Sequence, residues 1–275
     1  MVSDIKKNQT KTKLITVVNQ KGGVGKTTTV LNLATCLSAT GKKVLIIDLD
    51  AQGNASTGLG ILPEERKIST YDLIVAQERL SKLIKETKIP NLFIVPANSD
   101  LASVDMDLVN SDQRALKLRS SLENELSKQP AFDYIFMDCP PALNLLTVNS
   151  LVSANMVVIP LQTEFFALEG LSQLMLTIKE IRNTFNKELR ILGVLLTMFD
   201  KRNNLSIQIE EDVRSTLSDL VFKTMIPRNV KLSEAPSYSL PGVIYDRRCL
   251  GSVAYQKLAA EFLKREKIFF HPPDK

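Results

Sequence analysis

The stretch NQKGGVGKTTT, residues 19–29, decides the fold of this 275-residue chain. It nearly matches the phosphate-loop pattern G-x-x-x-x-G-K-[ST], but Gln20 stands where the first glycine belongs, and an additional lysine, Lys21, follows it. The apolar, β-branched run 14–19 precedes the stretch, and a helical pattern closed by Gly41 follows it. Because strand, glycine-rich turn and helix occur in this order, the stretch predicts a phosphate-binding loop rather than a turn without a ligand.

The residues of the loop supply a phosphate cradle and the reactive groups around it. Glycines let the backbone turn with its N–H groups pointing inward, and the helix N-terminus adds roughly half a positive charge. The cradle comprises Gly22, Gly23, Val24 and Gly25. We expect Lys26 to contact the β- and γ-phosphates, Thr27 to offer its hydroxyl to Mg²⁺, and Thr28 to reach an inner phosphate. The loop therefore predicts a nucleotide with magnesium.

Continuous apolar runs alternate with segments of helical period along the chain. The runs predict strands at 14–19, 42–50, 91–97, 133–141, 156–162, 190–199 and 220–227. Helical patterns cover 112–127, 143–153, 168–185, 204–219 and 252–265. Such strands joined by helices predict an α/β fold, a mostly parallel twisted sheet with helices on both faces. We expect a single domain with a phosphate-binding loop (P-loop) at 13–268, a flexible N-terminal tail at 1–12 and a C-terminal tail at 269–275.

Acidic residues end two of the predicted strands, where open α/β sheets bind their ligands. Asp138 ends one strand, the expected place for a carboxylate that holds Mg²⁺ through water. Asp48 and Asp50 end another and, two residues apart, point to the same side. Asp50 is nearer the loop and is the candidate for orienting or activating a water molecule. Acids at strand ends can instead cap helices, but the phosphate loop favours the functional interpretation.

Composition restricts the cellular setting. The chain is 44% apolar and has a formal charge of +5, as expected of a globular protein with a full core. No secretory signal and no membrane span are recognisable, so we expect a cytoplasmic protein. Cys36, Cys139 and Cys249 form no C-x-x-C pair, and the only histidine is His271, so neither zinc nor a structural disulfide is expected.

The positive charge is unevenly distributed along the chain. Residues 1–178 hold 18 Lys and Arg against 18 Asp and Glu, whereas residues 179–275 hold 17 against 12. Either a polyanion-binding side or a solvated basic surface without a partner would produce this distribution. Charge alone leaves the two alternatives open.

Five longer blocks add to the loop and resemble the ParA/Soj partitioning ATPases, which share the deviant Walker A motif KGGVGKTT with the MinD proteins. The blocks are VLIIDLDAQGNASTGLG, DYIFMDCPPALNLLTVNSL, VVIPLQTEFFALEGL, LLTMFDKRNNLSIQIEEDV and IPRNVKLSEAPSYSLP. The resemblance extends from about residue 13 to residue 266. It implies ATP and Mg²⁺ as cofactors, an ATP-dependent sandwich homodimer that binds double-stranded DNA non-specifically on the nucleoid, and slow intrinsic hydrolysis stimulated by a ParB-type centromere-binding protein.

The resemblance also implies residue roles. Lys21 would reach across the dimer to the nucleotide of the partner, and Asp50 would be needed for hydrolysis. Pro227 and Asn229 would lie near the adenine.

Two further positions match the DNA-contacting residues of the family, Arg202 and Lys231. Most members have arginine at the second position, but a contact to phosphate tolerates lysine. Most members also have proline where this chain has Ala51, beside Asp50. The added backbone freedom should affect hydrolysis only slightly, because the chemical groups are retained.

Three alternatives compete with a partitioning ATPase. A MinD-like positioning ATPase would bind membrane through the C-terminal segment FLKREKIFFHPPDK, but its two prolines end a helix. A reductase of the nitrogenase iron-protein type would need cysteines for a shared cluster, whereas Cys139 is expected to be a small buried residue. A DNA-coating scaffold without turnover is disfavoured because Asp50 and Asp138 are both present.

Overall fold

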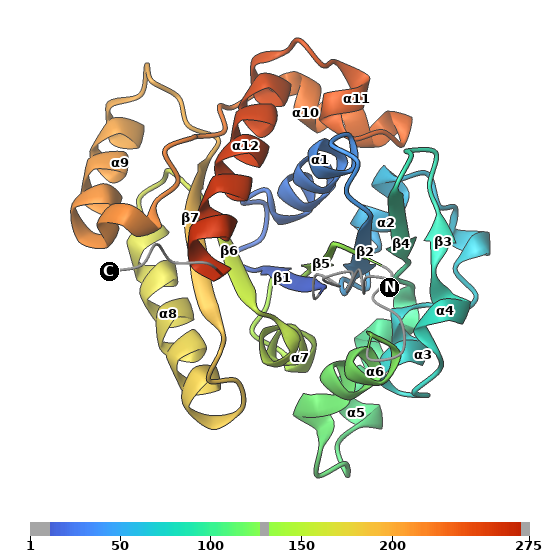
Figure 1. The fold of residues 1–275 in the computed structure, drawn as a ribbon. Coiled ribbons are helices and arrows are strands. Elements are labelled where there is room, and N and C mark those ends of the chain that lie inside the picture. Colours follow the sequence, from blue (N-terminus) through green and yellow to red (C-terminus); the bar gives the residue numbers. More distant parts are fainter. Residues whose placement is uncertain (1–11, 127–131, 271–275) are drawn as a thin grey trace, which may run out of the picture.

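The computed structural model describes residues 12–126 and 132–270. Most of the two predicted tails, 1–12 and 269–275, lies outside this part. The described chain has the predicted α/β fold, a seven-stranded sheet with helices packed on both faces (Figure 1). The strands are β1 (Lys13–Val17), β2 (Val44–Asp48), β3 (Lys85–Glu86), β4 (Leu92–Val95), β5 (Tyr134–Asp138), β6 (Met156–Gln162) and β7 (Arg190–Thr197).

The strand order is β3-β4-β2-β5-β1-β6-β7, and each neighbouring pair runs parallel except β3 and β4. The register brings Asp138 of β5 opposite Val17 of β1 on one side and opposite Asp48 of β2 on the other. Three central strands therefore end at the same level, and the chain leaves the sheet there into the glycine loop and the two acidic segments.

Helices cover the sheet on both sides (Figure 1). Their bounds are α1 (Lys26–Ser38), α2 (Asn54–Gly58), α3 (Thr70–Ile74), α4 (Leu80–Leu83), α5 (Val104–Asp107), α6 (Lys117–Leu126), α7 (Leu145–Ser153), α8 (Ala167–Thr184), α9 (Asn204–Leu217), α10 (Val230–Glu234), α11 (Gly242–Tyr245) and α12 (Leu250–Phe270). In Figure 1, α1 and α12 lie on one face and α6 and α7 on the other.

Alternate residues of the strands enter two separate hydrophobic clusters. In β2, Leu45 and Ile47 belong to the cluster that includes apolar residues of α6, α7 and α8, whereas Val44 and Ile46 belong to the cluster that includes those of α1 and α12. All four side chains are fully buried. A strand covered on both faces needs apolar residues at every position, which explains its continuous rather than alternating pattern.

The prediction of a strand at 220–227 is wrong. This segment lies along the outer side of β7, but it pairs only through two isolated bridges, Val194 with Val221 and Phe199 with Pro227. Its apolar and β-branched residues are typical of a strand, yet no continuous ladder forms.

Side chains of α12 explain why that ladder is interrupted. The backbone N–H groups of Lys223 and Thr224 donate to the carboxylate of Glu261 at 2.8 and 2.9 Å. One turn further along α12, the guanidinium of Arg265 donates to the carbonyl oxygen of Val221 at 2.5 Å. The helix therefore satisfies backbone groups that a sheet edge would otherwise pair.

The short strand β3 was not predicted. Lys85 and Glu86 have no apolar periodicity, and they join the sheet by antiparallel pairing with Ile94 and Phe93 of β4. A two-residue polar strand of this kind depends on its neighbour, so the local sequence carries no signal for it.

Gly193 of β7 allows the ring of Phe222 to pack against the sheet. A Cβ at Gly193 would lie 2.5 Å from one ring carbon of Phe222, whose side chain is fully buried. Gly193→Ala should lower the free energy of unfolding by about 1–3 kcal/mol, measured by denaturant titration. In combination with Phe222→Leu, which removes the clash, the loss should be smaller than the sum of the two single changes. Strict additivity would contradict this packing account.

Candidate phosphate-binding site

The loop between β1 and α1 has the backbone geometry that its glycines predict. Gly23 and Gly25 adopt positive φ angles of 76° and 87°, a region that side-chain-bearing residues rarely occupy. Gly25 is also the N-cap of α1, so the free N–H groups of the first helical turn open beside the loop. The altered first position, Gln20, leaves this geometry intact, because the turn is made by later residues.

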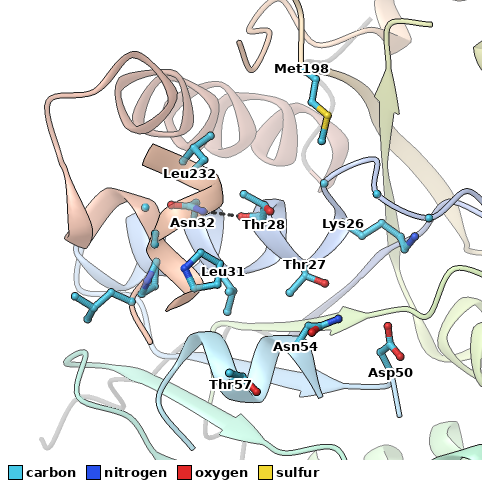
Figure 2. Close-up of a pocket in the computed structure, with 18 of the residues that line it drawn as sticks. Lys26, Thr27, Thr28, Leu31, Asn32, Asp50, Asn54, Thr57, Met198 and Leu232 are labelled. Carbon is cyan, nitrogen blue, oxygen red and sulfur yellow. Dashed lines mark hydrogen bonds between the residues drawn. The ribbon is translucent and has the colours of Figure 1, made fainter. Parts of the chain in front are cut away.

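The loop borders a pocket of about 350 Å³ at the carboxyl edge of the sheet (Figure 2). Six predicted residues of the loop and first helical turn line it: Gly22, Gly23, Gly25, Lys26, Thr27 and Thr28. Across from them lie Asp50 and two residues of the segment that follows it, Asn54 and Thr57 (Figure 2). Val24 is buried outside the lining, and its carbonyl oxygen accepts a hydrogen bond from Thr197 at 2.9 Å.

Lys26 is buried and bound to the loop itself. Its ammonium donates to the carbonyl oxygen of Lys21 at 2.8 Å, and only 7% of the residue is exposed. Burial lowers its pKa, and the carboxylates of Asp138 and Asp50 oppose this shift. A buried ammonium with one hydrogen bond to the protein keeps donors available for an anion in the pocket.

Lys21 points in a different direction. Its ammonium forms an ion pair with Glu164, which follows β6, and Lys21 is absent from the lining of the pocket. The additional lysine of the motif therefore does not serve the pocket of its own chain in this conformation.

The two acids of the DLD segment have separate roles. Asp48 is fully buried, and its carboxylate accepts hydrogen bonds from the N–H and the hydroxyl of Ser56 at 2.9 and 2.7 Å. Asp48 therefore fixes α2 to the sheet. Asp50 lines the pocket, so of the two acids it is the one with access to a ligand.

Asp138 is a buried carboxylate without a hydrogen-bond partner. It is fully buried, and neither carboxylate oxygen accepts a hydrogen bond from any described residue. Burial and the neighbouring carboxylate of Asp48 raise its pKa well above the usual range, while Thr27 and Lys26 oppose the shift. Such oxygens beside a threonine hydroxyl fit a hard cation, because Mg²⁺ prefers oxygen ligands and retains several waters.

Cys139, the residue after Asp138, is a small buried residue, as the sequence predicted. Only 1% of it is exposed, and its sulfur lies 3.2 Å from the hydroxyl of Thr16 and 3.0 Å from that of Ser150.

Apolar residues form the far end of the pocket. They come from α1, from the end of β7 and from the segment 232–241: Leu31, Met198, Leu232, Pro236, Leu240 and Pro241. The structure does not bring the two predicted adenine contacts to this wall. Pro227 lines a different hollow, and the Asn229 side chain caps α10 by accepting from the N–H of Lys231. Their proximity to a base stays a prediction that this conformation does not support.

The predicted DNA-contacting residues lie away from the pocket. Arg202 is 84% exposed and pairs with Asp200, whose pKa it lowers to about 2. It lines a second hollow of about 830 Å³ with other basic residues: Lys201, Lys223, Arg228 and Lys257. Lys231 lies outside this lining and pairs with Glu234. The segments that carry them are adjacent, since the N–H of Arg228 donates to the carbonyl oxygen of Phe199 at 3.2 Å.

Sequence reasoning missed several residues of the site. Asn54 and Thr57 lie in the block VLIIDLDAQGNASTGLG, shortly after Asp50. Their short distance from the end of a predicted strand was a usable signal. Glu164 also follows a strand at the carboxyl edge of the sheet. The apolar wall from residue 232 onward had no such signal, because its leucines and prolines are unremarkable until the chain folds back over α1.

Comparisons with known proteins give a consistent result. A family model described as an AAA domain matches residues 12–191. The chromosome partitioning protein ParA of Caulobacter vibrioides is 48% identical, covering 93% of this chain and 95% of that protein. The sporulation initiation inhibitor protein Soj of Bacillus subtilis is 47% identical, with coverages of 90% and 97%.

The same likeness is found among solved structures. Cobyrinic acid a,c-diamide synthase from Mycobacterium smegmatis, with bound ATP analogue and magnesium, has a TM-score of 0.80 and 33% identity. The alignment covers 93% of this chain and 96% of that chain. The likeness therefore extends over nearly the whole chain and well beyond the phosphate loop.

Replacement of Asp138 tests the cost of its buried carboxyl group. A carboxylate whose folded pKa is raised destabilises the fold as pH rises above its unfolded pKa. Asp138→Asn should therefore be more stable than the wild type by about 1–3 kcal/mol at pH 8 without ligand, with the difference disappearing toward pH 4. Chemical denaturation at several pH values measures this. A variant that is less stable at pH 8 would refute the proposed cost.

Proposed function

Since the chain belongs to the ParA/Soj family of chromosome-partitioning proteins, we propose that it is an ATPase that segregates DNA by cycling between ATP-bound and free states. One observation carries the proposal. A phosphate cradle, the buried Lys26 and the carboxylate of Asp50 meet in one pocket at the carboxyl edge of the sheet. This set provides phosphate binding, charge neutralisation and a water-orienting group, which phosphoryl transfer requires.

Magnesium fits the residues beside the cradle. Thr27 offers a hydroxyl in the pocket wall, and Asp138 has two oxygens with no hydrogen bond from the described residues. The solved Mycobacterium smegmatis structure, with an ATP analogue and magnesium, supports the same cofactors here. Bound Mg²⁺ would neutralise phosphate charge, and we propose that Thr27 binds it directly and Asp138 through water.

For hydrolysis, we assign Asp50 the water-orienting role. Its backbone is constrained by a turn, because the N–H of Gly53 donates to its carbonyl oxygen at 2.8 Å. One carboxylate oxygen accepts from the N–H of Gln52 at 3.0 Å. The remaining lone pairs can accept from water in the pocket. Ala51 lies within this turn, so the hydrogen bonds supply part of the rigidity that a proline would provide.

Lys21 supports an ATP-dependent homodimer. Its side chain lies outside its own pocket, in an ion pair at the surface with Glu164. Exposed ion pairs contribute about 0–1 kcal/mol, so this contact can be exchanged for a stronger one. We propose that Lys21 leaves Glu164 and binds the nucleotide of a second copy, which makes dimerisation depend on ATP.

Basic residues near Arg202 support non-specific binding to double-stranded DNA. Five cationic side chains line one hollow, and a dimer would present two copies of it. We propose that this surface places the ATP-bound dimer on the nucleoid and that a ParB-type protein stimulates the slow intrinsic hydrolysis. Within the described residues, no helix combines the length and the apolar composition needed to span a bilayer.

The dimer is tested with Lys21→Ala. This variant should bind ATP within about threefold of the wild type but lose the ATP-dependent dimer in size-exclusion chromatography, because it removes the contact across the dimer and no side chain that lines its own pocket. The matched control is Glu164→Gln, which removes the partner of Lys21 within the chain and keeps the lysine; it should still dimerise. An ATP-dependent dimer of normal stability in Lys21→Ala would refute the role of Lys21.

The DNA surface is tested with the double variant Arg202→Glu and Lys231→Glu. Its ATP-dependent affinity for DNA should fall more than about tenfold, and the salt dependence should become shallower by about two phosphates per protomer. The control is Lys85→Glu with Lys88→Glu, an equal charge change at the opposite edge of the sheet, which should retain binding. Equal losses in both variants would mean that net charge, and not this surface, determines DNA binding.

A further inference from the structure

Asn54 is a polar residue of the pocket to which the proposed reaction assigns no role. It is exposed, begins α2 and lines the pocket together with Asp50. In the described structure its carboxamide makes no hydrogen bond, although it carries two N–H donors and an acceptor oxygen. A side chain with this capacity, facing a phosphate cradle, is available to a ligand.

Two other neutral polar side chains of the pocket, Asn32 and Thr57, are already engaged in hydrogen bonds within the chain. Asn32 donates to the carbonyl oxygen of Thr28 at 2.8 Å and accepts from the N–H of Val243 at 2.9 Å. Thr57 donates to the carbonyl oxygen of Gly53 at 3.0 Å and accepts from Arg66 at 2.8 Å. Their hydrogen bonds hold the walls together, whereas Asn54 has no such structural function.

The helix that carries Asn54 is fixed from two sides. Asp48 holds the N–H and hydroxyl of Ser56 from the sheet. On the other side Arg66, which is only 6% exposed, donates to the carbonyl oxygens of Gly53 and Ile61. A buried guanidinium with several backbone acceptors is a rigid support, so the backbone position of Asn54 at the pocket is fixed before any ligand binds.

Figure 2 shows where the carboxamide points. It projects from α2 into the space between Thr27 and Asp50, toward the part of the cradle near Lys26. Asp50 as a carboxylate can only accept hydrogen bonds, so it binds water but repels a phosphate oxygen. An amide at the same place can donate to a phosphate oxygen and accept from the same water, which complements Asp50.

We propose that Asn54 is a further residue of the hydrolytic site, where its carboxamide contacts the terminal phosphoryl group of ATP and helps Asp50 to hold the attacking water. This inference rests on the proposed ATPase function. Because ADP lacks the terminal phosphoryl group, Asn54 distinguishes the triphosphate from the diphosphate. The contact strengthens when charge develops on the transferred group, so its effect is largest in the transition state.

The experiment is titration calorimetry of the full chain with Mg²⁺ and three ligands: ADP, a non-hydrolysable ATP analogue, and ADP with aluminium fluoride. Asn54→Ala should bind ADP within about twofold of the wild type. Its affinity for the analogue should fall about tenfold, and its affinity for ADP with aluminium fluoride by about ten- to a hundredfold. Phosphate release per ATP should slow by a similar factor. Asn54→Asp should discriminate further against the analogue, because a second carboxylate faces the phosphates.

Asn110→Ala is the matched control, since it removes an exposed amide outside the lining of the pocket. It should bind all three ligands as the wild type does. Equal affinity of Asn54→Ala and wild type for all three ligands would overturn the inference while leaving the ATPase function intact. An equal loss for ADP and the analogue would also overturn it, because the contact would then not involve the terminal phosphoryl group. If the wild type bound none of the ligands, the proposed function itself would fail.

Discussion

The in-register parallel pairing of β1, β5 and β2 is the constraint on which the rest of the molecule depends. It brings the ends of these strands, at Val17, Asp138 and Asp48, to one level. The segments that follow these strands therefore lie next to one another, and the glycine loop and the two acidic turns meet at a single edge of the sheet. The pocket follows from strand register, because the glycine loop begins just beyond the end of β1 and Asp50 lies just beyond the end of β2.

The same constraint creates an electrostatic conflict that a ligand can relieve. Asp48 and Asp138 are buried at paired positions of neighbouring strands, and the pKa of each is raised, that of Asp48 to about 6. Ser56 satisfies Asp48, but Asp138 has no donor among the described residues, and Lys26 is bound to a backbone carbonyl. Burying these charged groups costs free energy when no ligand is bound. Binding of a cation and a phosphate would offset this cost, so it favours the ligand-bound state.

Long-range side chains decide what local patterns cannot. The segment 220–227 has the composition of a strand, and Glu261 and Arg265, about 40 residues later, divert its backbone groups to α12. Arg66 similarly fixes the turn at Gly53 from outside the quoted motif. The fold class, six of the strands and the phosphate loop were predictable, because each follows from apolar runs or glycine spacing. The hydrogen bonds between distant segments were not predictable, since the local sequence of one partner does not indicate which residue the other partner is.

The sequence by itself determined the phosphate loop, the order of the main strands and helices, and the candidate acids. Apolar periodicity and the need for positive φ at Gly23 and Gly25 act over a few residues and can be recognised there. Only the tertiary structure decided that Asp48 supports α2, that Lys21 points to Glu164, and that the Asn54 carboxamide makes no hydrogen bond within the described chain. These roles depend on which groups each side chain meets, and burial and hydrogen-bond partners are set by segments distant in the chain.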